Sequence, residues 1–164
     1  MKKLSTAGTL AVFLLASATS ALANVTVTMA DPENFTDFYA NRAYDRDFIR
    51  SEILTHFARK AAALPANQNL KIDILDIDLA GRIEPSQRRL YDIRILRGGA
   101  DWPHMHLRYT LESNGQLLSG GDEHLSNMAY LHRINKYSTG DSLRFEKQMI
   151  DDWFVEKFRV KRPG

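Results

Sequence analysis

Residues 104–126 read HMHLRYTLESNGQLLSGGDEHLS, and this stretch decides the fold. Apolar and polar side chains alternate from His104 to Glu112, which is the period of a β-strand with one buried face. Asn114-Gly115 follows, a dipeptide that favours the tight turn of a β-hairpin. The sequence therefore predicts two antiparallel strands, with the return strand over Gln116–Ser126.

The turn also predicts which residues of the two strands face each other. A two-residue turn places Met105 opposite His124, which would put that histidine on the apolar face. Gly120-Gly121 offers a β-bulge, which would shift the pairing beyond it by one residue. In the shifted register His106 faces His124 and Met105 faces Leu125.

The shifted register would gather three imidazoles on one polar face. His104 and His106 are two residues apart on one strand, so they share a face, and His124 would join them with Asp122 nearby. Neutral imidazoles are common ligands of zinc and copper. The sequence thus predicts a Zn or Cu site at His104, His106 and His124; the alternative is a polar face that simply carries histidines.

Periodicity and turn residues predict the remaining elements. In chain order these are a strand at Val25–Met29, a helix over about Asp45–Leu64, a strand at Leu70–Leu79, a polar loop at Gly81–Arg89, a strand at Leu90–Leu96, a loop or short helix at Met128–Gly140, and a helix to about Phe158. The simplest architecture is a two-layer α+β domain of order β-α-β-β-β-β-α. Its mostly antiparallel sheet would have both helices packed on one face.

Several local features refine this prediction. The apolar phase changes within Leu70–Leu79, which indicates a bulge or a strand buried on both faces. Ser142 is a candidate N-cap of the last helix. On that helix Trp153 and Phe154 should face the sheet, and Asp151 should face water. His56 lies four residues after Glu52, and we expect the two to form an exposed pair.

The first 23 residues have the pattern of a secretory signal peptide. Lys2 and Lys3 precede an apolar run at 10–16, and Ala21-Leu22-Ala23 forms a small-x-small cleavage site. We therefore expect a single mature domain over 24–164 in the periplasm. The alternative is an N-terminal membrane anchor.

Composition excludes several classes of function for the mature chain. The full sequence has 22 Lys and Arg against 20 Asp and Glu, and two of the lysines lie in the leader, so the mature charge is balanced. Balanced charge argues against a nucleic-acid partner. A second apolar run near 18 residues is lacking, so we expect no integral membrane span after cleavage. The chain has no cysteine, which excludes thiol catalysis and cysteine-bound metals.

Other patterns point to chemistry only weakly. Asp76-x-Asp78-x-x-Gly81 resembles the start of a calcium loop, but Ala80 and Gln87 stand where ligands are needed. The sequence has no G-x-S-x-G elbow, no H-E-x-x-H and no phosphate-binding glycine loop. A local excess of arginine could contact lipid headgroups or a glycan, or form a solvated loop. Its members are Arg82, Arg88, Arg89, Arg94, Arg97 and Arg108.

Four short motifs occur in a characteristic order. They are Phe35-Thr36-Asp37, Asp76-Ile-Asp-Leu-Ala-Gly81, Trp102-Pro103, and the residues Glu146, Lys147, Met149, Asp151, Asp152, Trp153 and Phe154. Together they resemble the domain of unknown function 3016 family, over about Val25 to Phe158. That family consists of exported bacterial proteins without an established activity. The resemblance implies one complete domain and a periplasmic address, and it assigns no catalytic residue.

Three classes of function remain open at this point. We expect a non-catalytic periplasmic module that binds an envelope protein or another envelope component. The alternative is a small histidine-based metal-binding protein that uses the three imidazoles. An enzyme of an unrecognised type is the third class, and a deep pocket with convergent acids or bases would favour it.

Overall fold

The computed structural model of the 164-residue chain describes residues 23–37, 43–84 and 93–159. The elements are β1 (Asn24–Met29), a 3₁₀ turn η1 (Pro32–Asn34), α1 (Ala43–Ala61), β2 (Gln68–Asp78), β3 (Arg82–Glu84), β4 (Ile93–Ile95), β5 (His104–Ser113), β6 (Gln116–Ser126) and α2 (Arg144–Phe158). Helices and strands thus follow the predicted order, except that the structure has one additional short strand, β3.

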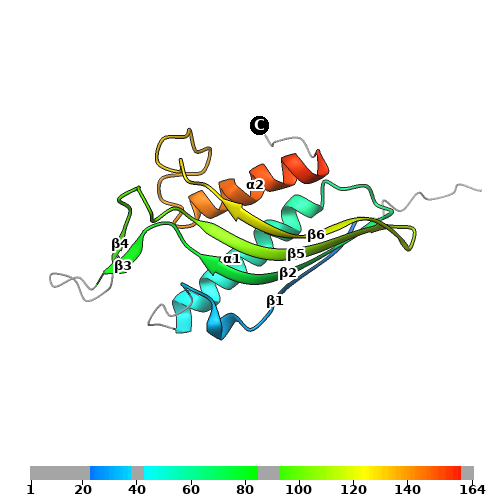
Figure 1. Cartoon of the computed structure of the whole chain (residues 1–164), viewed down its shortest axis with the longest axis horizontal. Helices are drawn as coiled ribbons and strands as arrows, with labels where there is room; N and C mark the ends of the chain where they lie inside the picture. Colours follow the sequence, from blue (N-terminus) through cyan, green and yellow to red (C-terminus); the bar gives the residue numbers. More distant parts are fainter. Residues whose placement is uncertain (1–22, 38–42, 85–92, 160–164) are drawn as a thin grey trace, which may run out of the picture.

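Four of the strands form one open sheet in the order β1-β2-β5-β6. β1 runs parallel to β2, with α1 as the crossover between them, and the other two pairings are antiparallel. β3 and β4 form a separate two-stranded ribbon. Both helices lie on the same face of the sheet (Figure 1). The predicted α+β class, with a mostly antiparallel sheet, is confirmed.

Helix α1 packs on the sheet through side chains at every fourth position. Ile49, Ile53, Phe57 and Ala61 are all buried, as their spacing predicted. They belong to one core with the inward side chains of β2, β5 and α2. The helix begins two residues before the expected start and ends at Ala61, three residues before the expected end.

A bulge in β2 keeps Leu70, Ile72, Ile74 and Ile77 on the helix-covered face. The register with β5 shifts between Ile74 and Asp76, so Leu75 is the extra residue. Ile77 is therefore buried on the same face as Ile74. The predicted phase change is confirmed as a bulge, and it leaves Asp76 and Asp78 on the opposite face.

The β5–β6 hairpin has the shifted register. Met105 pairs with Leu125 and His106 with His124. The extra residue is Leu118, close to the turn, so the expected bulge at Gly120-Gly121 was wrong by two positions. Gly120 stays in the ladder instead, where an added Cβ would lie 3.1 Å from the carbonyl oxygen of Tyr109. It therefore serves a close backbone approach.

The segment after β2 was assigned incorrectly at one place. Residues 82–84 form strand β3 and pair with β4, although the whole of Gly81–Arg89 was predicted as a loop. Of the predicted strand Leu90–Leu96, the structure has Ile93–Ile95 as β4, and residues 85–92 lie outside the described part of the chain. The pattern could not predict a ribbon of three residues a side, because so short a strand shows no period.

Helix α2 begins without a side-chain cap. Leu143 is the N-cap residue, so the prediction of Ser142 was wrong. Asp141 partly replaces the missing side-chain cap, because its Oδ1 accepts a hydrogen bond from the Leu143 N–H at 2.9 Å. The apolar stripe agrees with the sequence, since Trp153 and Phe154 are buried against the sheet.

Two side chains predicted to be exposed lie in the interior between the helices. His56 is 1% and Asp151 2% exposed, so both predictions were wrong. His56 Nε2 lies 2.9 Å and Lys60 Nζ 3.1 Å from Asp151 Oδ1, while Tyr137 donates to Oδ2 at 2.7 Å. Burial opposes ionisation of Asp151, but these bonds and one from Lys136 hold its pKa well below the usual range.

Candidate functional site

The face of the sheet turned away from both helices carries the candidate site (Figure 1). Met105, Leu107 and Tyr109 of β5 are buried under the helices. Alternation along a strand then turns the side chains between them to the other side. This open face includes Asp76 and Asp78 of β2, His104, His106 and Arg108 of β5, and Asp122 and His124 of β6.

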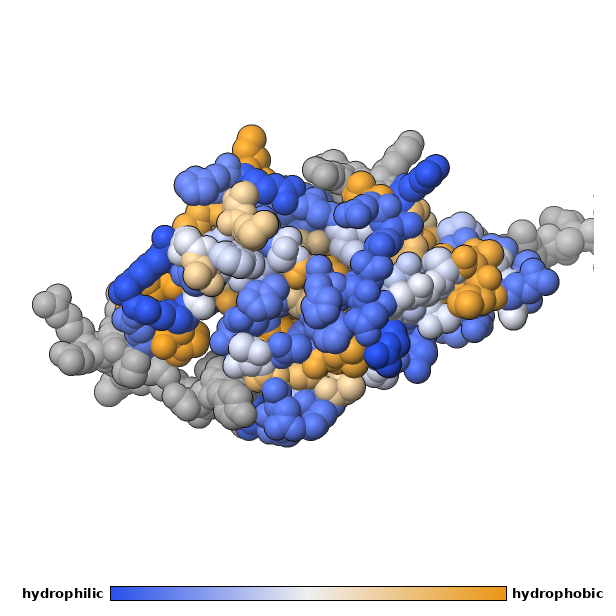
Figure 2. Space-filling view, viewed as in Figure 1, coloured by the Kyte–Doolittle hydropathy of each residue, from blue (hydrophilic) through white to orange (hydrophobic). Residues whose placement is uncertain are grey.

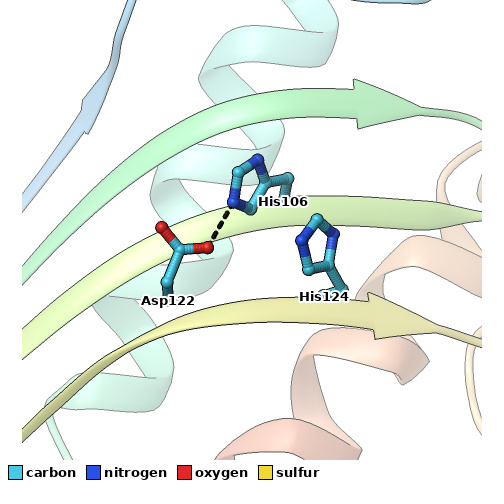
Figure 3. A group of neighbouring side chains, drawn as sticks. All are labelled: His106, Asp122 and His124. Atoms are coloured by element: carbon cyan, nitrogen blue, oxygen red, sulfur yellow. Dashed lines mark hydrogen bonds and ion pairs between the residues drawn. The ribbon is translucent and has the colours of Figure 1, made fainter.

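Three of these side chains form a compact group at the β5–β6 pairing. His106 Nε2 is hydrogen-bonded to Asp122, and the rings of His106 and His124 stack with centroids 4.1 Å apart and planes at 11° (Figure 3). One ligand atom from each residue lies within 4.8 Å of the others. Two imidazole nitrogens and a carboxylate thus stand together on an accessible surface.

The carboxylate of this group is held in its ionised form. A hydrogen bond from His106, followed by one from Arg108, lowers the pKa of Asp122 below its usual value. Arg108 Nη2 lies 3.0 Å from Asp122 Oδ2. An ionised carboxylate attracts a cation, whereas the neighbouring guanidinium repels one. Arg108 therefore limits how strongly a metal ion could be held here.

The structure does not bring His104 into the group. Its Nε2 lies 2.9 Å from Asp78 Oδ2, and its Nδ1 lies 3.1 Å from the carbonyl oxygen of Trp102. His106 and His124 are brought together as predicted, and Asp122, expected only as a neighbour, supplies the third ligand atom. A predicted set of three imidazoles is replaced by two imidazoles and a carboxylate.

A second titratable cluster, which sequence reasoning missed, lies at the end of β2. Asp37 Oδ2 accepts a hydrogen bond from the Leu79 N–H at 2.7 Å, and the carboxyls of Asp37 and Asp78 are hydrogen-bonded to each other. Burial, with the nearby charge of Asp78, raises the pKa of Asp37 to about 6. The two carboxyls therefore share a proton at mildly acidic pH.

The raised pKa gives Asp37→Asn a pH-dependent effect on stability. Asp37 contributes stability when protonated, and this contribution is lost as the pH rises from 3.8 through about 6. The asparagine stays neutral and keeps an acceptor for Leu79. As the pH rises from 4 to 8, we expect the free energy of unfolding of Asp37→Asn, measured in urea, to increase relative to that of the wild type. A difference that is constant with pH would contradict the shared proton.

The motif residues of the sequence analysis bind one another across the fold. Thr36 donates its N–H and hydroxyl to Asp76 at 2.7 and 2.8 Å. Glu146, fully buried at the start of α2, accepts from the Ala80 N–H at 2.9 Å and pairs with Arg94. Trp102 packs on the small apolar cluster that contains Ala80. These contacts join the segment after η1, the end of β2 and α2, so these motif residues have a structural role.

Fold and site together define a two-layer α+β domain whose sheet has one covered face and one open, polar face with a histidine–aspartate group. The chain belongs to the DUF3016 family, described as a protein of unknown function, whose sequence model matches residues 23–156. No curated protein and no solved structure matches the chain significantly. Among the described residues, neither helix is long and apolar enough to cross a bilayer.

Proposed function

We propose that the protein is an exported, non-catalytic binding domain of the bacterial envelope, and that its open sheet face binds a zinc or copper ion. The signal-peptide pattern of residues 1–23 supports export. The proposal assigns no reaction to the chain, since His106 is partly exposed and Asp122 and His124 are exposed, whereas catalytic groups commonly work in a site that excludes water. A protein or another component of the envelope remains the expected partner.

The observation that supports metal binding is the separation of the ligand atoms. His106, Asp122 and His124 each offer one atom within 4.8 Å of the other two. In a tetrahedral zinc site the ligand atoms are about 3.3 Å apart, given Zn–N distances near 2.0–2.1 Å. Small side-chain rotations at this accessible surface would close that difference. Three protein ligands leave one position for water or for a partner's side chain.

Metal binding at this group is expected to depend on pH. Only a neutral imidazole has a free nitrogen lone pair for a metal. Metal binding should therefore release protons and weaken in acid.

Calorimetric titration with zinc or copper salts tests the proposal. The protein is taken from the periplasmic fraction of cells that express the full chain, so that every variant has the same N-terminus. We expect one ion per chain, and His124→Ala should weaken binding by at least about a hundredfold, because a direct ligand matters more than an outer-shell one. His106→Ala should have a similar effect.

Two further variants make the titration specific for the observed group. His104→Ala should leave the affinity unchanged, because His104 is paired with Asp78. Arg108→Gln should strengthen binding, because it removes the positive charge beside Asp122. The metal proposal would be contradicted if the wild type bound neither zinc nor copper, or if the wild type and His124→Ala bound the ion with equal affinity.

A further inference from the structure

The outer edge of β6 offers backbone hydrogen-bonding groups that the described fold leaves unused. Just beyond the strand, the Asn127 N–H donates to the Pro103 carbonyl oxygen at 3.1 Å, which fixes the phase of the pairing with β5. The backbone groups of an antiparallel strand point alternately toward its partner and away from it. Asp122, His124 and Ser126 therefore direct their N–H and C=O groups to the free edge, where no other described strand pairs.

These three residues belong to the regular part of the strand. The extra residue Leu118 lies near the turn, and the pairing with β5 continues without a shift from Ser119 to Ser126. All three outward-directed residues are exposed. A regular, exposed edge can accept a further strand, because the ladder of backbone hydrogen bonds continues across it.

A groove lies beside this edge, between β6 and α2. Its volume is about 230 Å³, and it is lined by residues 123–126 of β6 and by Met149, Asp152, Trp153, Glu156 and Lys157 of α2. Figure 2 shows mostly hydrophilic residues where this strand and this helix lie side by side. Trp153 is 5% exposed, and its Nε1 has no hydrogen-bond partner among the described residues. The lining therefore includes a buried donor that the fold leaves unsatisfied.

The charges that line the groove leave one acid without a partner. Glu123 pairs with Lys157 at 2.7 Å, and Asp152 pairs with Arg133 at 2.6 Å. Glu156 is exposed and forms no ion pair within the described part of the chain. Once these pairs are counted, a single negative charge remains beside the free edge. A cationic side chain is the complement of such a charge.

We propose that β6 binds an extended, basic segment of another envelope protein as an additional strand. The main chain of that segment would bond to His124 and Ser126, and a lysine or arginine side chain would pair with Glu156. Strand addition is a recurring mode of peptide recognition, in which main-chain bonds give affinity and neighbouring pockets give specificity. The inference rests on the proposed binding function, because it names the kind of partner, and it needs no metal ion.

Selection from a phage-displayed library of random decapeptides tests the strand addition. The target is the periplasmic form of the wild type, kept in EDTA so that metal binding plays no part. We expect the selected peptides to carry at least one lysine or arginine. A selected peptide, synthesised and labelled, should slow the amide hydrogen exchange of His124 and Ser126, because their N–H groups become bonded.

Two substitutions of Ser126 separate the main chain from the side chain. Ser126→Pro removes the outward N–H and should weaken binding of the synthetic peptide by about tenfold, the loss of one main-chain hydrogen bond. Proline is tolerated at an edge position whose N–H faces solvent, so circular dichroism should show an unchanged fold. Ser126→Ala keeps the N–H and should bind as the wild type does. Glu156→Gln should weaken binding by roughly threefold, since the pair it removes is exposed.

The outcomes distinguish this inference from the proposed function. Selected peptides with equal affinity for the wild type and Ser126→Pro, or with equal losses in Ser126→Pro and Ser126→Ala, would contradict strand addition and leave the binding function in place. Failure to select any peptide would overturn the strand addition, and the metal titration of the same protein then decides whether the binding domain stands. A dimer that forms without peptide and is lost in Ser126→Pro would make a second copy the occupant and would overturn the basic segment.

Discussion

Replacing Asp151 by asparagine is expected to lower the free energy of unfolding by roughly 3–5 kcal/mol at pH 7. The amide keeps the shape of the side chain and loses its charge. Lys60 and His56, both buried, would then face a neutral group in place of a carboxylate. Urea unfolding monitored by tryptophan fluorescence measures the loss, because Trp153 is buried on the same helix.

The neighbouring residue provides the control for this prediction. Asp152 is half-buried and forms an ion pair with Arg133, so Asp152→Asn should change stability by about 1 kcal/mol or less. The pKa of Asp151 is lowered in the fold, so its contribution is present above pH 3.8 and is lost as the pH falls below that value. The wild type and Asp151→Asn should therefore converge in acid. Equal effects of the two substitutions at pH 7 would contradict a buried anion at the centre of the network.

Gly81→Ala should be nearly as damaging, by roughly 2–5 kcal/mol. Gly81 has φ +81°, where an L side chain is strained, and an added Cβ would lie 2.3 Å from the Ile95 carbonyl oxygen and 2.8 Å from a methyl group of Leu96. The N–H of Gly81 also bonds to the Asp101 carbonyl oxygen at 2.8 Å, which limits movement away from the clash. Thermal and urea unfolding measure the effect.

Gly99→Ala separates the clash from the backbone strain. Gly99 has a similar φ of +75°, but an added Cβ meets no atom within 4 Å. Its substitution should therefore cost only the conformational penalty, about 1–2 kcal/mol. If Gly81→Ala and Gly99→Ala lowered the free energy of unfolding equally, the close contact between Gly81 and β4 would contribute nothing to the effect.

The sequence predicted those parts of the fold whose side chains repeat with a regular period. Ile49, Ile53 and Phe57 mark the buried face of α1 directly, and the alternation after His104 marks β5. Hydrophobic burial follows such patterns because each element has one side against the core. The short strand β3 was missed because three residues are too few to show a period.

The buried ionic network lay beyond sequence reasoning for a different reason. His56 and Asp151 are 95 residues apart, and each stands in a helix where a charged side chain normally faces water. Their burial depends on how α1 and α2 approach each other on the sheet. Charge types along one helix carry no information about that approach.

The candidate site was predicted in part, and the register explains which part. One extra residue between the turn and His124 places that histidine opposite His106, and a glycine pair suggested the extra residue. His104 lies outside the group because its partner Asp78 comes from β2, directly opposite in the antiparallel pairing. Pairing between distant strands cannot be read from the hairpin alone.

The bulge at Leu118 has a consequence for how the molecule behaves at high concentration. β6 is an edge strand, and no other described strand pairs with its outer side. An unpaired edge is a template for aggregation, which natural sheets prevent with kinks and charges. The displaced Leu118 interrupts the regular backbone near the turn, and Asp122 and Glu123 follow in the same strand. Two copies that met edge to edge would find a broken hydrogen-bonding pattern and like charges, and both features disfavour pairing of this strand with a second copy.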